Sequence, residues 1–341
     1  MHDIIVVGGS AGALEGLTVL LEDMPQTLRA SVCAVLHASE SGLAFLPSLL
    51  QRRTRMKIRI AADGDPVRRG TVFLPPPDHH LLLRPGRTIV NRGPKQNRFR
   101  PAIDPLFVSA AAAYGPRVVG VLLSGLLDDG VHGLADIQKN GGVTVVQHPE
   151  DAPIPILPEN ALRAMRIDHV VPAVRMGQLL QELSRTPSRK AAAGRKHRTA
   201  ERETRLLGPG PTRIPRSSPS PFTCPECDGA LWMTSEAPAM LRCHVGHAFT
   251  PSSLLAGQRE VGDQRLWGAV RSLEEQAEMH RRFVPAGAPA ARRQDFRRHA
   301  EALERRALVL RRILVEASPG PRHAAKPRPH HTRRAAGRRA S

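Results

Sequence analysis

Ser10 is the residue whose setting points most directly to chemistry. It lies in the segment IIVVGGSAGALEGL, where an apolar run breaks into glycines and then resumes with helical spacing. This pattern predicts a strand, a tight turn that carries Ser10, and a helix that begins directly behind it. The N–H groups at the start of such a helix point at the hydroxyl and can stabilise a developing oxyanion. Ser10 is therefore a candidate nucleophile.

Two partners for such a nucleophile follow other strand-like runs. The run SVCAVL is followed by His37, and VVGVLLSGLL is followed by Asp128 and Asp129. Parallel strands end at the same edge of a sheet, so we expect these side chains to meet Ser10 there. A neutral imidazole can accept the serine proton, and a buried carboxylate can fix its tautomer. The chain order differs from that of α/β-hydrolases, but a triad is defined by geometry and not by order.

The same glycines also fit a different class of protein. A dinucleotide-binding turn carries G-x-G-x-x-G and an acidic residue at the end of the second strand. Here Ser10 interrupts the glycine motif, and the second strand ends in His37. A histidine at a strand end is often structural, and Asp-Asp-Gly is often only a turn. From spacing alone, catalysis and dinucleotide binding remain equal alternatives.

A second chemical cluster lies near residue 235. Its residues have the spacing Cys-x2-Cys, then fifteen residues, then Cys-x3-His, and they are Cys224, Cys227, Cys243 and His247. This spacing predicts a structural zinc site, with His244 as a rival fourth ligand and Trp232 and Phe249 as hydrophobic cover. So short a segment cannot bury enough core to fold without the metal. Four protein ligands leave no open position for catalysis.

The elements between these motifs alternate in type. Strands are predicted at 3–7, 31–36, 71–75, 80–83, 118–124 and 143–147, and leucine-rich helical spacing separates several of them. Short continuous apolar strands separated by helices indicate a doubly wound, mostly parallel α/β sheet with helices on both faces. Cys33 lies in mid-strand and is expected to be a buried core thiol.

Composition sets the domain boundaries. The formal net charge is +19, but segments 184–221 and 319–341 carry eight and seven of these charges in Pro-, Ala- and Ser-rich sequence. We expect both to be disordered, and aromatic residues at 3% make nucleic-acid stacking improbable. The predicted parts are a catalytic domain at 1–183, a linker at 184–220, a zinc module at 221–250, a helical segment at 251–317 and a tail at 318–341. Without a signal peptide or an apolar span, we expect a cytoplasmic protein that does not insert into membranes.

The helical segment contains two amphipathic stretches. Their apolar residues are Leu255, Val261, Leu266, Ala269, Val270 and Leu273, then Phe296, Leu303, Ala307, Leu310, Ile313 and Leu314. Pro285 and Pro289 separate the two stretches, which predicts a helical hairpin. Its apolar stripe either covers the zinc module or is a dock for a protein partner or a second copy.

Several motifs taken together resemble a known family. IIVVGGSAGALEGL, LHAS, RGPKQNRFRPAIDPLF, LLSGLLDDGVHGLADI and GGVTVVQHPEDAPIPILPENAL are similar, in order, to the catalytic domain of chemotaxis-type protein-glutamate methylesterases, the CheB family. The resemblance covers about residues 3–183. It implies hydrolysis of glutamate γ-methyl esters on receptor signalling proteins with release of methanol, deamidation of some glutamines, and no cofactor for catalysis. The zinc segment resembles a module found behind some stand-alone methylesterase domains.

The resemblance also implies roles for individual residues. Ser10 is the nucleophile, His37 the base and Asp129 the orienting acid, whereas Asp128 is a loop residue. The remaining implied residues are Ala11, Gly125 and Leu126 as oxyanion donors, with Leu127 in the same loop, and Arg100, Pro101 and Asp104 as lining residues.

The sequence departs from the family pattern in two ways. LHAS lacks the usual proline after His37, and Gly-Leu-Leu replaces a common Gly-Met-Gly, which affects substrate fit more than chemistry. The catalytic strand also starts at residue 3, so we expect no control by an aspartyl phosphate within the chain. A catalytically silent adaptor that binds through the zinc module and the basic linker is the main alternative function.

Overall fold

The computed structural model describes residues 1–188, 217–234 and 239–317. The predicted linker and tail fall largely outside the described residues. The chain forms two compact units, which divide between Gln258 and Arg259. Among the described residues, no helix is long and apolar enough to cross a membrane.

The first unit is built on a seven-stranded parallel sheet with the order β3-β4-β2-β1-β7-β8-β9. Its strands are β1 (Ile4–Gly9), β2 (Ser31–Leu36), β3 (Lys57–Ile60), β4 (Thr71–Leu74), β7 (Val118–Leu122), β8 (Val143–Gln147) and β9 (His169–Val171). The central strands β1, β2 and β7 are completely buried, as their continuous apolar sequences predict. The three strands that precede Ser10, His37 and Asp129 are therefore direct neighbours.

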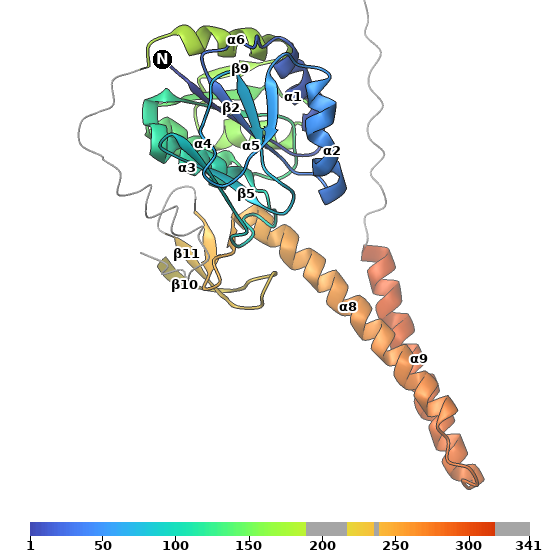
Figure 1. The fold of residues 1–341 in the computed structure, drawn as a ribbon. Coiled ribbons are helices and arrows are strands. Elements are labelled where there is room, and N and C mark those ends of the chain that lie inside the picture. The colour runs from blue at the N-terminus through green and yellow to red at the C-terminus, as the bar shows by residue number, and fades with distance from the viewer. Residues whose placement is uncertain (189–216, 235–238, 318–341) are drawn as a thin grey trace, which may run out of the picture. The chain divides into compact units, whose positions relative to one another are not determined.

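Helices cover both faces of this sheet (Figure 1). They are α1 (Ala13–Glu22), α2 (Glu40–Gln51), α3 (Ile103–Tyr114), α4 (Val131–Lys139), α5 (Ile156–Ala164) and α6 (Ala173–Arg185). Alternate residues of each strand point to opposite faces. Ile5 and Val7 pack with α1, α2 and α6, whereas Ile4 and Val6 pack with α3, α4 and α5. The fold is therefore the doubly wound α/β sheet that the sequence indicates.

The strand predictions need two corrections. The run at 80–83 does not join the parallel sheet, because β5 (His80–Arg84) pairs antiparallel with β6 (Arg87–Asn91) as a separate hairpin. The strand β5 packs on α3 and is buried by that contact, so its apolar run looks like a sheet strand. The edge strands β3 and β9 were not predicted, because they are short and only partly buried.

A small antiparallel sheet belongs to the same unit. Its strands are β10 (Ser217–Thr223), β11 (Ala230–Thr234), β12 (Leu241–Cys243) and β13 (Ala248–Phe249). We call this sheet with its Cys and His residues the ribbon. Its core holds six buried residues: Cys224, Leu231, Leu241, Cys243, Phe249 and Leu254. The compact unit that contains the ribbon extends to Gln258, in the helix that follows.

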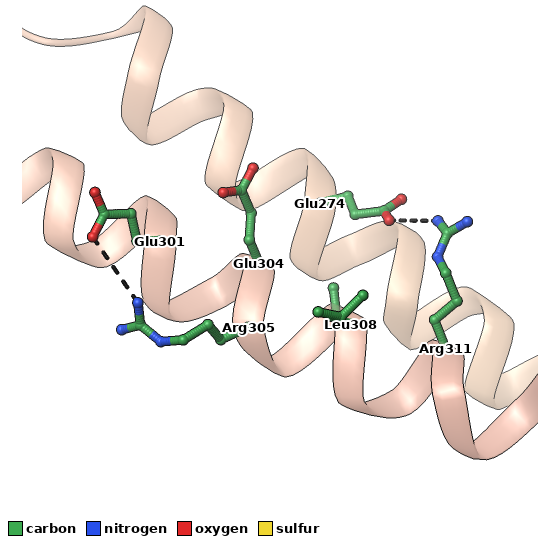
Figure 2. A pocket seen from close by; sticks show the side chains of 7 residues that line it. Glu274, Glu301, Glu304, Arg305, Leu308 and Arg311 are labelled. Atoms are coloured by element: carbon green, nitrogen blue, oxygen red, sulfur yellow. Dashed lines mark hydrogen bonds and ion pairs between the residues drawn. The ribbon is translucent and has the colours of Figure 1, made fainter.

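The second unit contains most of α8 (Pro251–Arg282) and α9 (Ala290–Ala317), which confirms the predicted helical hairpin. Val270, Ala307 and Leu314 form its small buried core. A groove of about 440 Å³ lies between the helices, and Figure 2 shows Arg311 of α9 reaching Glu274 of α8 beside Leu308. Large apolar side chains of this unit remain exposed, among them Phe283 at 70% and Ile313 at 52%.

Candidate active site

The structure brings Ser10, His37 and Asp129 into one hydrogen-bonded chain. His37 Nδ1 lies 3.2 Å from Ser10 Oγ, and His37 Nε2 lies 2.8 Å from Asp129 Oδ2. The imidazole and the carboxylate are almost fully buried, with side chains 4% and 3% exposed. An ionised carboxylate can only accept, so the ring proton lies on Nε2 and the lone pair of Nδ1 faces the hydroxyl. This tautomer is the one that can accept the serine proton.

Asp129 is held by donors on every side. Its Oδ2 also accepts from the backbone N–H of Ile103 at 2.7 Å, and its Oδ1 accepts from Asn97 Nδ2 at 2.9 Å and the Asp104 N–H at 3.2 Å. Burial by itself would raise the pKa of Asp129, but the hydrogen bonds from His37, the Ile103 N–H and Asn97 Nδ2 lower it overall. The carboxylate therefore stays charged in a dry site.

Asp104 is not the substrate-lining residue that the resemblance implies. It is buried beneath Asp129, where its Oδ1 accepts from the N–H groups of Gly130 and Gly133 at 3.0 and 2.7 Å. Burial and the charge of Asp129 raise the pKa of Asp104, which the Gly133 N–H partly offsets. Of the two neighbouring carboxyl groups, Asp129 therefore carries the negative charge that faces His37.

Arg100 is also tied down. Its guanidinium pairs with Asp78 at 2.7 Å and donates to the Gly93 carbonyl at 2.9 Å. These contacts fix the loop before α3 and leave the Arg100 side chain 19% exposed, and its contact with substrate stays a prediction. Phe99, one residue earlier, lies against the base: its ring stacks on His37 with centroids 3.7 Å apart and planes 11° apart.

The implied oxyanion donors are only partly available. Gly125 N–H is not free, because it donates to the Ile154 carbonyl at 3.0 Å. Gly125 instead permits close approach, since an added Cβ would lie 2.8 Å from Ser10 Cβ. The N–H groups of Ala11 and Leu126 have no acceptor within the described part of the chain. Ala11 directly follows Ser10, and Leu126 directly follows Gly125, which approaches Ser10. They are the remaining candidates for the oxyanion.

The four predicted metal ligands converge in the ribbon. The donor atoms of Cys224, Cys227, Cys243 and His247 all lie within 4.8 Å of one another. Cys227 Sγ is 3.7 Å from Cys243 Sγ, and His247 Nδ1 is 3.5 Å from Cys243 Sγ. A tetrahedral ion with Zn–S bonds of about 2.3 Å separates two sulfur ligands by about 3.8 Å. The cluster is therefore compatible with zinc, and His244 lies instead edge-on to Trp232 at 4.3 Å.

The cysteines divide into two environments. The hydrogen bond with Cys224 lowers the pKa of the Cys243 thiol, which favours its thiolate. Cys33 is fully buried in β2, and burial raises the pKa of its thiol to about 12. This is the inert core thiol that the sequence predicts.

Sequence reasoning missed the turn at residues 96–99, which we call the Asn97 turn. Asn97 and Phe99 lie in the quoted block RGPKQNRFRPAIDPLF, but no role was assigned to either residue. Their contacts with Asp129 and His37 depend on a tight turn in which Asn97 and Arg98 have φ of 50° and 76°. An asparagine that tolerates the left-handed region is a local signal for such a turn, but it does not identify the contacts.

His80, at the start of β5, is a buried histidine that makes the stability of the fold depend on pH. It is completely buried, Nε2 donates to the Pro94 carbonyl at 3.1 Å, and Nδ1 accepts from Ala102 N–H at 3.3 Å. Burial lowers the pKa of His80 from 6.5 to about 4, and the nearby charge of Arg100 acts in the same direction. Between these values the unfolded chain binds a proton that the folded chain does not, so stability falls as the pH falls.

We expect His80 to reduce the free energy of unfolding by about 2 kcal/mol between pH 7 and pH 5. His80→Gln keeps a donor and an acceptor but does not titrate. Between pH 7 and pH 5 the free energy of unfolding of this variant should therefore fall by about 2 kcal/mol less than that of wild type. Denaturant unfolding of both proteins at the two pH values measures the difference. Equal losses in both proteins would contradict the assignment.

Known proteins share the first domain of this chain. The CheB methylesterase family model matches residues 5–180. A protein-glutamate methylesterase/protein-glutamine glutaminase of Anaeromyxobacter dehalogenans is 34% identical over 183 residues, which are 54% of each protein. A relative from Leptospira interrogans is 31% identical over 183 residues, which are 53% of this chain and 95% of that protein.

A solved structure agrees with the sequence relatives. The CheB methylesterase catalytic domain of Thermotoga maritima matches with a TM-score of 0.51 and 26% identity, over 54% of this chain and 99% of that one. The chain spans about half the length of several curated relatives that it matches. A dinucleotide-binding assignment for the glycine turn finds no support in these matches. Because the family model covers more than half of the sequence and the fold agrees, this chain belongs to the CheB methylesterase family.

Proposed function

We propose that this protein hydrolyses glutamate γ-methyl esters on receptor-type signalling proteins and releases methanol. The observation that carries the proposal is the continuous contact from Ser10 through His37 to a buried, charged Asp129. The methylesterase names of the curated relatives support the same chemistry. Glutamine deamidation follows the same steps, with ammonia as the leaving group.

Acylation begins with the proton of Ser10. His37 Nδ1 accepts it while Ser10 Oγ attacks the γ-carbonyl carbon, and the carbonyl π electrons move to oxygen. Asp129 stabilises the imidazolium formed in this step. When the tetrahedral intermediate collapses, His37 returns the proton to the methoxy oxygen, so methanol leaves and the glutamyl group remains bound to Ser10.

Deacylation repeats the sequence with water. His37 accepts a proton from water, the resulting hydroxide attacks the acyl carbon, and Ser10 Oγ regains its proton as the glutamate carboxylate departs. The N–H groups of Ala11 and Leu126 are the proposed donors to both oxyanions. Leu126 is 48% exposed, so a substrate carbonyl can reach this loop from solvent.

The surface beside Ser10 suits a substrate as large as a protein helix. A groove of about 910 Å³ begins at Gly12 and Pro153 and runs between α1 and α2. Three exposed apolar side chains line it, Leu14 at 41%, Phe45 at 71% and Leu49 at 43%. This groove supports a receptor helix as the substrate, and activity in the cytoplasm is part of the proposal.

The ribbon is the proposed site of one structural zinc ion. Three thiolates and one imidazole would fill its coordination shell, so the ion supplies folding stability and no part of the reaction. The exposed apolar residues of the C-terminal hairpin support the further expectation of a protein partner there.

The decisive experiment is methanol release from a methylated receptor signalling fragment. We expect release by the full chain and at least a 10³-fold slower rate in Ser10→Ala, since the nucleophile is absent. Ser272→Ala is a matched control on α8, where the hydroxyl accepts from Gln276 Nε2, and it should release methanol at the wild-type rate. Equal release by Ser10→Ala would reject the mechanism, and no release by any protein would favour the silent adaptor.

A further inference from the structure

The Asn97 turn joins the catalytic triad to the ribbon, and both ends of this connection lie in the first unit. Gln96 and Phe99 exchange backbone hydrogen bonds at 3.1 and 2.9 Å, which closes the turn. Asn97 and Arg98 both have positive φ, a conformation that costs free energy for residues other than glycine. Such a turn persists only when surrounding contacts hold it.

On one side the turn contacts both the base and the acid of the triad. Phe99 stacks on His37, and Asn97 Nδ2 donates to Asp129 Oδ1 and Asp104 Oδ2, each at 2.9 Å. Asn97 is 1% exposed, so water does not replace these contacts. A shift of the turn would therefore displace the ring and the carboxylate together.

On the other side the turn is bound to the ribbon. Asn97 N–H donates to the Ala248 carbonyl at 2.7 Å, and Gln96 Nε2 donates to the Gly246 carbonyl at 3.0 Å. These two carbonyls belong to the residues on either side of His247, one of the four clustered metal ligands. The position of the His247 backbone and that of the turn are therefore linked directly.

The orientation of the Asn97 amide also depends on this region. Its Oδ1 accepts from Thr250 N–H and from Ser253 Oγ, each at 3.0 Å. A backbone N–H can only donate, so the atom facing Thr250 must be the oxygen, and the nitrogen must face the two carboxyl groups. All hydrogen-bonding positions of this buried amide are then filled, which leaves it one favourable orientation.

A second contact supports the same connection. Asp128, the neighbour of the triad acid, accepts from Thr250 Oγ1 at 2.7 Å and from Ser252 Oγ. The residues that follow the ribbon thus hold both Asn97 and the loop that carries Asp129.

We propose that Asn97 is a positioning residue for Asp129 and His37, and that the metal-loaded ribbon holds it in place, so that reactivity of Ser10 depends on the metal. The inference rests on the proposed triad but not on the identity of the methylated substrate. Loss of the metal would release the His247 segment and free the Asn97 turn, so that Asp129 loses the Asn97 donor and His37 loses the Phe99 ring. The ribbon would thereby act as an intramolecular activator of the catalytic domain.

The test measures how fast a fluorophosphonate probe labels Ser10 in the full chain, because this reaction needs the triad but no receptor. Asn97→Asp keeps the shape and the turn but replaces the amide donor with a carboxylate beside two others. We expect Ser10 of this variant to be labelled about 10²-fold more slowly, because its catalytic groups are misplaced.

A second variant weakens the contact on the ribbon side. Ser253→Ala, which removes one hydrogen bond to Asn97, should be labelled about 5- to 10-fold more slowly. Ser220→Ala is the matched control within the ribbon, where its hydroxyl donates to the Leu231 carbonyl and accepts from the Phe222 N–H, and it should label at the wild-type rate.

Metal removal tests the link itself. Chelation of the wild-type protein should slow labelling about 10²-fold, and added zinc should restore the rate. The same chelation should change the labelling rate of Asn97→Asp little, because that variant already lacks the amide donor to Asp129. Circular dichroism checks that the parallel sheet persists in every sample. If wild type releases methanol, Asn97→Asp and the chelated wild-type protein should have a lower kcat than metal-loaded wild type, with KM changed less than about threefold.

Wild-type labelling rates in Asn97→Asp and Ser253→Ala would overturn the positioning role. An unchanged rate after complete metal removal would overturn the dependence on metal. If wild type is labelled at Ser10 but releases no methanol, only the proposed substrate is rejected. The labelling rates would still decide whether Asn97 and the metal position the triad.

Discussion

Asp129→Asn is expected to lower kcat about 10⁴-fold, with little change in KM. Four donors surround the Asp129 carboxylate, from His37, Ile103, Asn97 and Asp104. An amide nitrogen facing His37 would donate to Nε2 and move the ring proton to Nδ1, where it blocks proton transfer from Ser10. An amide nitrogen on the other side would face the donors of Asn97 and Asp104. The first orientation removes the productive tautomer, and the second keeps it but sets an N–H group against two other donors, so neither orientation preserves the native hydrogen bonds.

Methanol release under saturating substrate measures this effect. Asp136→Asn is the matched control, because Asp136 lies on α4 and pairs with two residues of the same helix, Lys139 at 3.4 Å and His132 at 3.7 Å. We expect that variant to keep kcat within about twofold, as is usual for surface changes. A loss of less than about tenfold in Asp129→Asn would show that the carboxylate does not set the tautomer of His37.

Loss of zinc is expected to unfold the ribbon. Its core holds only six buried residues, two of which are the cysteine ligands Cys224 and Cys243. Zinc binding supplies about 10 kcal/mol or more in zinc-finger peptides, which is comparable with the whole stability of an ordinary domain. Elemental analysis should find about one zinc ion per chain, and Cys243→Ser should lower this content and open residues 217–250 to proteolysis.

Cys33→Ala is the matched control for this experiment. It removes a thiol that lies in β2 and outside the cluster, so zinc content and protease resistance of the ribbon should stay at wild-type values. A ribbon that resists proteolysis without metal, in protein purified in the absence of chelators, would reject the structural zinc site.

The sequence alone predicted the features that rest on local patterns. Continuous apolar runs predicted β1, β2 and β7, because a parallel strand buried on both faces admits few polar residues. The residues after these strands predicted the meeting of Ser10, His37 and Asp129, because the order of the strands places their ends side by side. Ligand spacing likewise predicted the four residues of the metal cluster.

Local patterns failed where a contact depends on distant parts of the chain. Asp104 and Gly125 have the residue types of a binding loop, but one is buried under Asp129 and the other donates to the Ile154 carbonyl. The strand β5 looks like part of the sheet, because packing on α3 buries it equally well. Burial and hydrogen-bond partners are properties of the packed molecule. A pattern in the sequence therefore cannot tell a residue that is free to bind substrate from one that is buried or already hydrogen-bonded.

The Asn97 turn shows this division most clearly. The sequence predicted that Ser10, His37 and Asp129 would meet and that Cys224, Cys227, Cys243 and His247 would form a separate cluster. Only the tertiary structure decided that Asn97 lies between Asp129 and Ser253, residues 124 positions apart in the chain numbering. The physical reason is that a buried amide must satisfy its donors and its acceptor at once, and folding alone brings partners for both to the same place.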